Sequence, residues 1–167
     1  DAQLSRGLGD VYKRQGLVTS YIAAAVKASV LLIEKEKMGG DCLNTGCVPS
    51  KALIKVAKLK KQAIDAAKFG LSSENLETDF PKVMKRVQEV IKKIEPHDSV
   101  ERYEGLGVNC LSGDAKVIDP WTVEIDGKKY TGKNLVVATG AEAFVPPIKG
   151  VQDVPYLTTE TLWKLKE

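Results

Sequence analysis

The chain has 167 residues, of which 43% are hydrophobic and 28% charged, and its formal net charge is +3. These values are typical of one globular domain, and so small a net charge gives no indication of nucleic-acid or anionic-membrane binding. No apolar run approaches the roughly 18 residues of a membrane span, and three cysteines, an odd number, do not predict a secreted disulfide framework, so we expect a cytoplasmic protein.

The first half of the chain predicts the second part of a βαβ unit followed by helices. Residues 17–28 are rich in alanine and predict a helix, and the apolar, β-branched run 30–34 predicts a buried strand. A cysteine-containing segment comes next. From residue 48 to about residue 69 the pattern is again helical, and this helix is expected to end at Gly70.

A second long helix is predicted after Gly70, with Asp79 as its N-cap and Pro81 in its first turn. Its apolar residues recur at intervals of three and four, which indicates one continuous apolar face. The residues of this stripe are Phe80, Val83, Met84, Val87, Val90, Ile91 and Ile94. A short helix is expected near residues 99–104.

From Val108 the pattern changes to a period of two, which favours strands. The segments VNCL, AKVI, TVEI and KKYT predict a group of antiparallel strands, and Asp126-Gly127 is a strong hairpin signal. Residues 134–140, NLVVATG, predict a buried strand that ends in a glycine turn. This order of elements describes an α/β nucleotide-binding domain with an inserted β-meander.

The segment 39–54, GGDCLNTGCVPSKALI, places Cys42 and Cys47 five positions apart at the start of a predicted helix. In a regular α-helix, residues at this interval have Cα atoms about 8–9 Å apart, beyond the ~4.4–6.8 Å that a disulfide tolerates. The pair can bridge only if the backbone between the cysteines is irregular, and Asn44 and Gly46 supply turn conformations. Near a helix N-terminus, free amides and the macrodipole favour a thiolate at Cys47. A strained, partly exposed pair of this kind is typical of a redox-active disulfide.

Other interpretations of the cysteines stay open. The pair can be two unrelated cytosolic thiols, although the glycines, proline and lysine around it argue against this. A zinc site needs about four ligands at close spacing, which the distant Cys110 and His97 do not supply, so we expect no metal. Cys110 lies in a predicted strand and is expected to be a small core residue, and His97 to be an exposed residue in a helix break.

The cysteine segment resembles the active-site signature of the pyridine nucleotide–disulfide oxidoreductases, G-G-x-C-x-N-x-G-C-x-P-S-K, and meets each of its fixed positions. Within that family it is most similar to dihydrolipoyl dehydrogenases and to mercuric-reductase-like flavoproteins. The resemblance continues through LIEKEKMGG and NLVVATGAEAFVPPIKG and covers roughly residues 16–167. It implies a Rossmann-like FAD-binding domain, with a parallel sheet and an inserted antiparallel β-meander, and FAD and NAD(P)H as cofactors.

The resemblance also implies a role for each matching residue. Cys42 corresponds to the thiol that exchanges with a dithiol substrate, Cys47 to the thiol that exchanges electrons with the flavin, and Lys51 to a lysine near the flavin's reactive nitrogen. Glu34, which ends the strand 30–34, corresponds to the acid that accepts hydrogen bonds from the adenosine ribose. The other residues expected to contact FAD are Gly16, Gly39, Gly40, Asp41, Ala115, Thr139 and Gly140.

The chain departs from the family pattern near its N-terminus. Counted back from the ribose-binding acid, the G-x-G-x-x-G fingerprint should occupy residues 11–16, where this chain has VYKRQG, so only Gly16 remains. Val11 and Lys13 stand where glycines allow the tight turn and the approach of the pyrophosphate. The polar stretch upstream is unlike a buried first strand. We therefore expect residues 1–15 to be foreign to the domain and the position of its native first strand to be empty.

Relatives in this family carry a nicotinamide-binding and a dimerisation domain after this region. We therefore expect residues 16–167 to be the FAD-binding part of a homodimeric disulfide oxidoreductase, in which electrons pass from NAD(P)H through FAD and the Cys42–Cys47 disulfide to substrate. The substrate would be a disulfide or dithiol, or mercuric ion. By itself the chain is expected to bind FAD weakly and not to turn over. Two alternatives stay open: a non-catalytic remnant, and a flavin-free thiol-redox or metal-handling protein.

Overall fold

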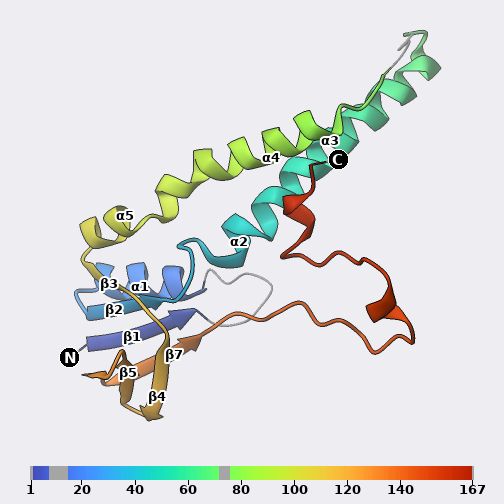
Figure 1. The fold of residues 1–167 in the computed structure, drawn as a ribbon. Helices are drawn as coiled ribbons and strands as arrows, with labels where there is room; N and C mark the ends of the chain where they lie inside the picture. The colour runs from blue at the N-terminus through green and yellow to red at the C-terminus, as the bar shows by residue number, and fades with distance from the viewer. Residues whose placement is uncertain (1, 8–14, 72–75, 167) are drawn as a thin grey trace.

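The computed structural model describes residues 2–7, 15–71 and 76–166. Its α-helices are α1 Gln15–Ala25, α2 Gly40–Asn44, α3 Cys47–Asp65, α4 Phe80–Ile94 and α5 Val100–Gly105. Its strands are β1 Ala2–Gly7, β2 Ser29–Glu34, β3 Val108–Ser112, β4 Ala115–Asp119, β5 Thr122–Ile125, β6 Lys128–Thr131 and β7 Asn134–Ala138. Short 3-10 helices are η1 Ala66–Phe69, η2 Glu95–Asp98, η3 Val151–Asp153 and η4 Leu162–Lys164. Figure 1 shows a layered part around β1, β2 and β7, from which α3 and α4 project.

Four parallel strands form the central sheet in the order β3-β2-β1-β7. β1 lies between β2 and β7, with the Cα of Leu4 opposite Leu31 on one side and Leu135 on the other. The expectation of an empty first-strand position is therefore wrong, because residues 2–7 fill it. The strands of a parallel sheet are joined by hydrogen bonds between main-chain N–H and C=O groups, and β2 and β7 each have an edge whose groups need partners. Even a polar segment can therefore occupy the position between them. That residues 1–15 are foreign to the domain stays a prediction.

Alternate residues of β2 face two different layers, because successive side chains of a strand point to opposite faces. Val30 and Leu32 pack against α1 and α5, in a cluster that includes Leu17 and Tyr103. Leu31 and Ile33 pack on the other face against β4 and β5; their buried partners there are Ala115, Val123 and Ile125. The parallel sheet is thus covered by helices on one face and by antiparallel strands on the other, which confirms the α/β fold with an inserted meander.

The strand β3 departs from its predicted place. It was expected among the antiparallel strands, but it pairs in parallel with β2, Val108 lying opposite Val30. The reason is that a short alternating run does not specify its partner, whereas helix α5 returns the chain so that β3 runs in the same direction as β2. The antiparallel sheet therefore has the order β4-β5-β6. Its hairpin at Asp126-Gly127 is confirmed, with φ values of 49° and 77°.

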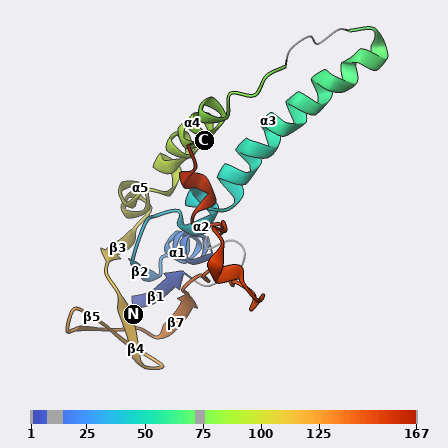
Figure 2. The same cartoon turned by 45° about the vertical axis from the view of Figure 1, so that its right-hand side comes forward.

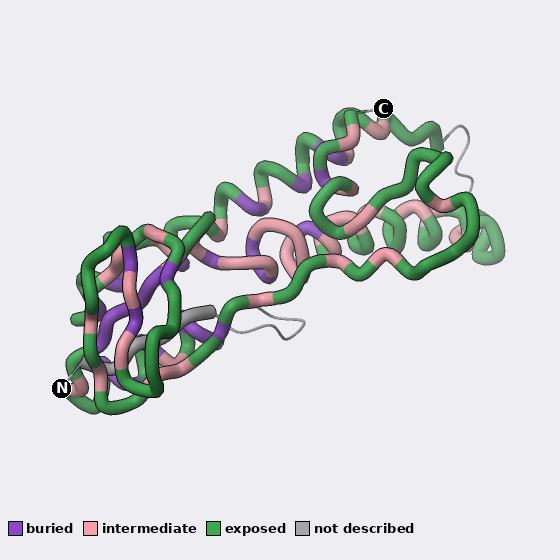
Figure 3. The backbone as a smooth tube through the Cα atoms, turned by 60° about the horizontal axis from the view of Figure 1, so that its bottom comes forward, coloured by how far each residue is buried: buried purple, intermediate pink, exposed green. Residues whose placement is uncertain are grey.

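The helices α3 and α4 lie side by side and hold a third cluster of buried side chains (Figures 1 and 2). Met84, Val87 and Ile91 of the predicted stripe are buried there against Leu43 of α2. The N-cap prediction is also confirmed, since the Asp79 carboxylate accepts a hydrogen bond from the main-chain N–H of Lys82 at 3.0 Å. Figure 3 shows burial concentrated in the sheet and along one side of α4.

After β7 the chain leaves the sheet and returns to the helices. Figures 1 and 2 show this segment running outward and bending back, so that η4 reaches α2, α3 and α4. Trp163 of η4 belongs to the same buried cluster as Leu43 and Val87. The last described residues therefore complete the packing of the helical part. In the described part of the chain, none of the helices has both the length and the apolar character needed to cross a membrane.

Candidate cofactor and dithiol site

The two cysteines lie on different helices. Cys42 is in α2, which ends at Asn44, and Cys47 is the first residue of α3. Thr45 and Gly46 connect the helices with non-helical dihedral angles, φ −134° and −114°. The irregular backbone that a bridge between the two cysteines would require is therefore present. The thiols are therefore not held at the fixed interval that one continuous helix would impose.

Hydrogen bonds within the segment hold this connection, which we call the dithiol turn (residues 41–47). The main-chain carbonyl of Asp41 accepts hydrogen bonds from the N–H groups of both Thr45, at 2.9 Å, and Gly46. The side-chain amide of Asn44 donates to the carbonyls of Gly40, at 2.9 Å, and Met38, at 3.2 Å. Asn44 thus acts through its side chain, and it remains in α2 instead of adopting a turn conformation.

Two glycines are required by the packing of this region. A Cβ atom on Gly46 would lie 2.8 Å from the main-chain oxygen of Asp41, which cannot move away without breaking the turn. Gly39 has φ 86°, and a Cβ there would collide with the side chain of Leu43. Because Leu43 is one of the most deeply buried side chains, this collision could not be relieved by a rotation into solvent.

The three cysteines have different environments, and all are thiols in the structure. Cys42 is buried, with 7% of its surface exposed, and Cys47 is half-buried. Cys110 was predicted to be a core residue; it is partly buried and packs against the cluster of Val30 and Leu32. Burial raises the pKa of the Cys110 thiol, and the negative charge of Glu104 adds to this effect. Cys110 is therefore less suited to thiolate chemistry than an ordinary thiol.

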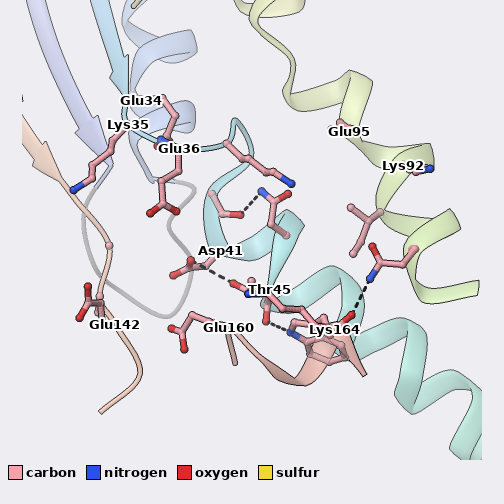
Figure 4. A pocket seen from close by; sticks show the side chains of 18 of the residues that line it. Glu34, Lys35, Glu36, Asp41, Thr45, Lys92, Glu95, Glu142, Glu160 and Lys164 are labelled. Carbon is pink, nitrogen blue, oxygen red and sulfur yellow. Dashed lines mark hydrogen bonds between the residues drawn. The ribbon is translucent and has the colours of Figure 1, made fainter. Parts of the chain in front are cut away.

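A cavity of about 1600 Å³ lies between the end of β2, α2, α4 and the C-terminal segment (Figure 4). It is larger than the roughly 300–1000 Å³ of most small-ligand pockets, so it has room for an extended dinucleotide. Five of the predicted cofactor residues line it. They are Glu34, Gly40, Asp41, Thr139 and Gly140.

The remaining predicted residues lie elsewhere among the described residues. Gly16 is buried in α1. Ala115 is a core residue of β4, with 1% exposed, and Gly39 is buried under Leu43. Cys42, Cys47 and Lys51 do not line the cavity, and Lys51 is exposed on α3. Residues 11–14, which hold most of the altered phosphate fingerprint, lie outside the described residues.

Among the other residues that line the cavity, Gly113, Glu160 and Trp163 were not indicated by the sequence patterns. Gly113, in the turn after β3, donates its main-chain N–H to the Glu34 carbonyl at 3.0 Å, and a side chain there would collide with Ile125. Its position directly after a predicted strand was a usable signal. Glu160 and Trp163 come from the far end of the chain. Nothing in their local sequence indicates a contact with residues more than a hundred positions earlier.

The charges around the cavity are mixed. Figure 4 shows the carboxylates of Glu36, Asp41 and Glu160, from three separate segments, around one part of it, and the lining as a whole contains as many lysines as acidic residues. Glu160 accepts a hydrogen bond from the Thr158 hydroxyl at 2.6 Å, and this bond is the main reason that its pKa is lowered. An anionic ligand would therefore be held by main-chain amides and individual contacts, since the cavity has no excess of positive charge.

The acid predicted to bind ribose is oriented by its own neighbour. A carboxylate oxygen of Glu34 accepts a hydrogen bond from the main-chain N–H of Glu36 at 3.0 Å. The carboxylate stands at the carboxyl end of β2, which is where ligands bind in open parallel sheets. Within the described residues, no group of three or more His, Cys, Asp and Glu side chains is arranged to hold a metal ion.

Comparison with known protein families gives one match over almost the whole chain. Residues 16–167 match the family described as "Pyridine nucleotide-disulphide oxidoreductase". The chain belongs to this family. Its parallel sheet with an antiparallel addition is the flavoprotein disulfide reductase FAD-binding fold.

Similar proteins come from two groups of enzymes. The chain is 32% identical over 145 residues to mercuric reductase of Bacillus cereus, covering 87% of this chain and 23% of that protein. It is 36% identical over 137 residues to dihydrolipoyl dehydrogenase of Geobacillus stearothermophilus, covering 79% of this chain and 29% of that protein. The chain therefore spans about a quarter of the length of these relatives.

A solved structure shows the same fold. The HOCl-induced flavoprotein disulfide reductase RclA from Escherichia coli has a TM-score of 0.74 and 26% identity, over 100% of this chain and 34% of that one. Its Cu(II) complex matches equally well, with 25% identity. The likeness extends over both the layered part and the helical part of the present structure.

Proposed function

We propose that this chain is the FAD-binding and dithiol-bearing part of an NAD(P)H-dependent flavoprotein disulfide reductase. One observation carries the proposal: the dithiol turn contributes Asp41 and Thr45 to the same cavity that Glu34 and Thr139 line at the ends of β2 and β7. The turn that carries the thiols therefore borders the space in which an adenosine group would meet its ribose-binding acid, although the cysteines themselves do not line it. Family membership supports the same conclusion.

The residues present fit FAD at the points that the structure describes. Glu34 offers an oriented carboxylate at the carboxyl end of a parallel strand, and Gly40, with φ 55°, lines the cavity and lets the backbone approach a ligand closely. Gly113 and Gly140 line the same cavity. When bound, FAD would relay two electrons from a nicotinamide to the cysteine pair.

The chain's own residues would carry out thiol–disulfide exchange. Reduction of the Cys42–Cys47 disulfide takes up two electrons and two protons and yields two thiols. The thiolate of Cys42 would then attack a substrate disulfide and release one substrate thiol, and Cys47 would attack the mixed disulfide, release the second and restore the pair. Lys51 would place a cation near this chemistry. Residues 16–167 would form the FAD-binding domain of a homodimer, with a disulfide, a dithiol or mercuric ion as substrate.

Thiol labelling tests the first part of this proposal. Alkylation of the oxidised chain before and after mild reduction should gain two labels, both on the peptide that carries residues 39–54. Cys110→Ser should leave this gain unchanged, because Cys110 is a partly buried thiol in β3, outside the dithiol turn. Cys42→Ser should abolish it, since the remaining Cys47 has no partner in the turn. A gain of label on Cys110 in the unaltered chain would refute the assignment of the pair.

Titration with FAD tests the cofactor. Val11 and Lys13 replace two glycines of the phosphate fingerprint, and each lost hydrogen bond to a charged group costs about 1.5–3 kcal/mol, so we expect a dissociation constant above about 1 μM. Glu34→Ala should weaken binding at least about tenfold further. Glu124→Ala, on β5 and outside the cavity, is the control and should leave the affinity unchanged. Equal affinities for the Glu34 variant and the parent would contradict the ribose contact.

A further inference from the structure

The peptide unit between Thr45 and Gly46 is bound at both of its polar groups. The N–H of Gly46 donates to the carbonyl of Asp41 within the dithiol turn. The carbonyl of Thr45 accepts a hydrogen bond of 2.7 Å from the indole N–H of Trp163, across 118 positions of sequence. Because both groups of one planar unit are fixed, this unit cannot rotate without breaking a hydrogen bond. Gly46, whose N–H belongs to this unit, is the residue directly before Cys47.

Trp163 is itself held firmly. It is 8% exposed and packs among Leu43, Met84 and Val87. Its main-chain carbonyl accepts a hydrogen bond from the side-chain amide of Gln88 on α4 at 3.2 Å. The indole therefore reaches the dithiol turn from a rigid support that α4 provides, and its position does not depend on the turn alone.

We propose that Trp163 is a positioning residue for the cysteine pair and that its hydrogen bond to Thr45 favours the Cys42–Cys47 disulfide. This inference rests on the proposed function. Cys42 and Cys47 lie on different helices, so the distance between their sulfur atoms depends on how rigidly the connecting turn is held. A free peptide unit before Cys47 would let the two sulfurs separate and would lower the effective concentration of one thiol at the other.

The test is the equilibrium of the chain with glutathione. One cysteine thiolate attacks glutathione disulfide and releases one glutathione, and the second attacks the mixed disulfide and releases another, so two electrons pass from the protein to glutathione. Trp163→Phe keeps an aromatic ring in the cluster but has no N–H to donate. It should lower the equilibrium constant for disulfide formation about three- to tenfold, equivalent to about 15–30 mV. Urea unfolding checks that the variant is folded.

Trp121 provides the matched control, because it is the other tryptophan of the chain and is 60% exposed between β4 and β5. Trp121→Phe should have the equilibrium constant of the unaltered chain. A folded Trp163→Phe chain with that same constant would overturn the positioning role while leaving the proposed function standing. If the unaltered chain formed no Cys42–Cys47 disulfide at all, the proposed function itself would fail.

If the Trp163→Phe variant does not fold, a second measurement tests the positioning role of Trp163. In the Trp121→Phe chain the only remaining tryptophan is Trp163, so its emission reports on the dithiol turn. We expect this emission to differ between the oxidised and reduced chain, and the difference to vanish when Cys42 and Cys47 are both serine. Identical emission in the two redox states would overturn the proposal.

Discussion

At the scale of single residues, the dithiol turn depends on a position that has no room for a side chain. Gly46 is enclosed by the main chain of Asp41 and Cys42, and the Asp41 carbonyl beside it already accepts two hydrogen bonds. The turn therefore has few alternative conformations. Its geometry follows from a close contact between backbone atoms, which is less adaptable than a contact between flexible side chains.

Gly46→Ala should destabilise the folded chain by about 1–3 kcal/mol, because its Cβ would lie 2.8 Å from the Asp41 oxygen and would force the turn apart. Urea unfolding followed by circular dichroism measures this change. Gly105→Ala is the control, since a Cβ at this last residue of α5 meets no atom within 4 Å. The control should be neutral or slightly stabilising. Equal unfolding midpoints for the two variants would contradict the close contact at Gly46.

At the scale of elements, α4 joins the local and the long-range parts of the structure. Its N-terminus is capped by Asp79, its apolar face packs on α2 and α3, and Gln88 supports Trp163. Disturbing the start of this helix should therefore weaken the support of the dithiol turn as well as the helix itself. The cap is the simplest place to make such a change.

Asp79→Ala should lower the free energy of unfolding by about 0.5–2 kcal/mol, since the N–H of Lys82 loses the carboxylate that accepts its hydrogen bond. Thermal or urea unfolding gives this value. Glu89→Ala removes an acidic side chain from the exposed side of the same helix and should change stability by less than about 0.5 kcal/mol. A cap variant as stable as the Glu89 variant would show that the Asp79 bond does not contribute.

At the scale of the whole molecule, the parallel sheet depends on residues 2–7, whose polar sequence is unlike that of a buried strand. β1 pairs with β2 and β7, so the sheet is continuous only if residues 2–7 stay in place. Without them, the main-chain groups along the facing edges of β2 and β7 would lose their partners. The structure thus assigns a central part of the fold to residues expected to be foreign to the domain.

Ser5→Pro tests this assignment, because proline has no N–H and removes a ladder hydrogen bond from a central strand. The Cα of Ser5 lies opposite Leu32 on one side and Val136 on the other. We expect the free energy of unfolding to fall by at least about 1–3 kcal/mol relative to Ser5→Ala, measured by urea unfolding. Equal stability of the proline and alanine variants would mean that residues 2–7 do not form the central strand.

The sequence by itself determined most of the elements and the family. Helix faces, caps and tight turns depend on local geometry, so they can be predicted from residues that are close together in sequence. This holds for the apolar stripe of α4, its Asp79 cap and the Asp126-Gly127 hairpin. The cysteine signature indicated the family for the same reason: its residues are close together in sequence. The interval between the cysteines showed that a bridge would need an irregular backbone, and the structure has one at Thr45 and Gly46.

Only the tertiary structure decided which distant segments meet. The entry of residues 2–7 into the sheet and the parallel pairing of β3 depend on which strand edges need partners, and no local pattern states this. The hydrogen bond from Trp163 to Thr45 depends on the return of the C-terminal segment to α4. The local sequence could show the two thiols, but the support of the turn between them arises from packing between residues 118 positions apart.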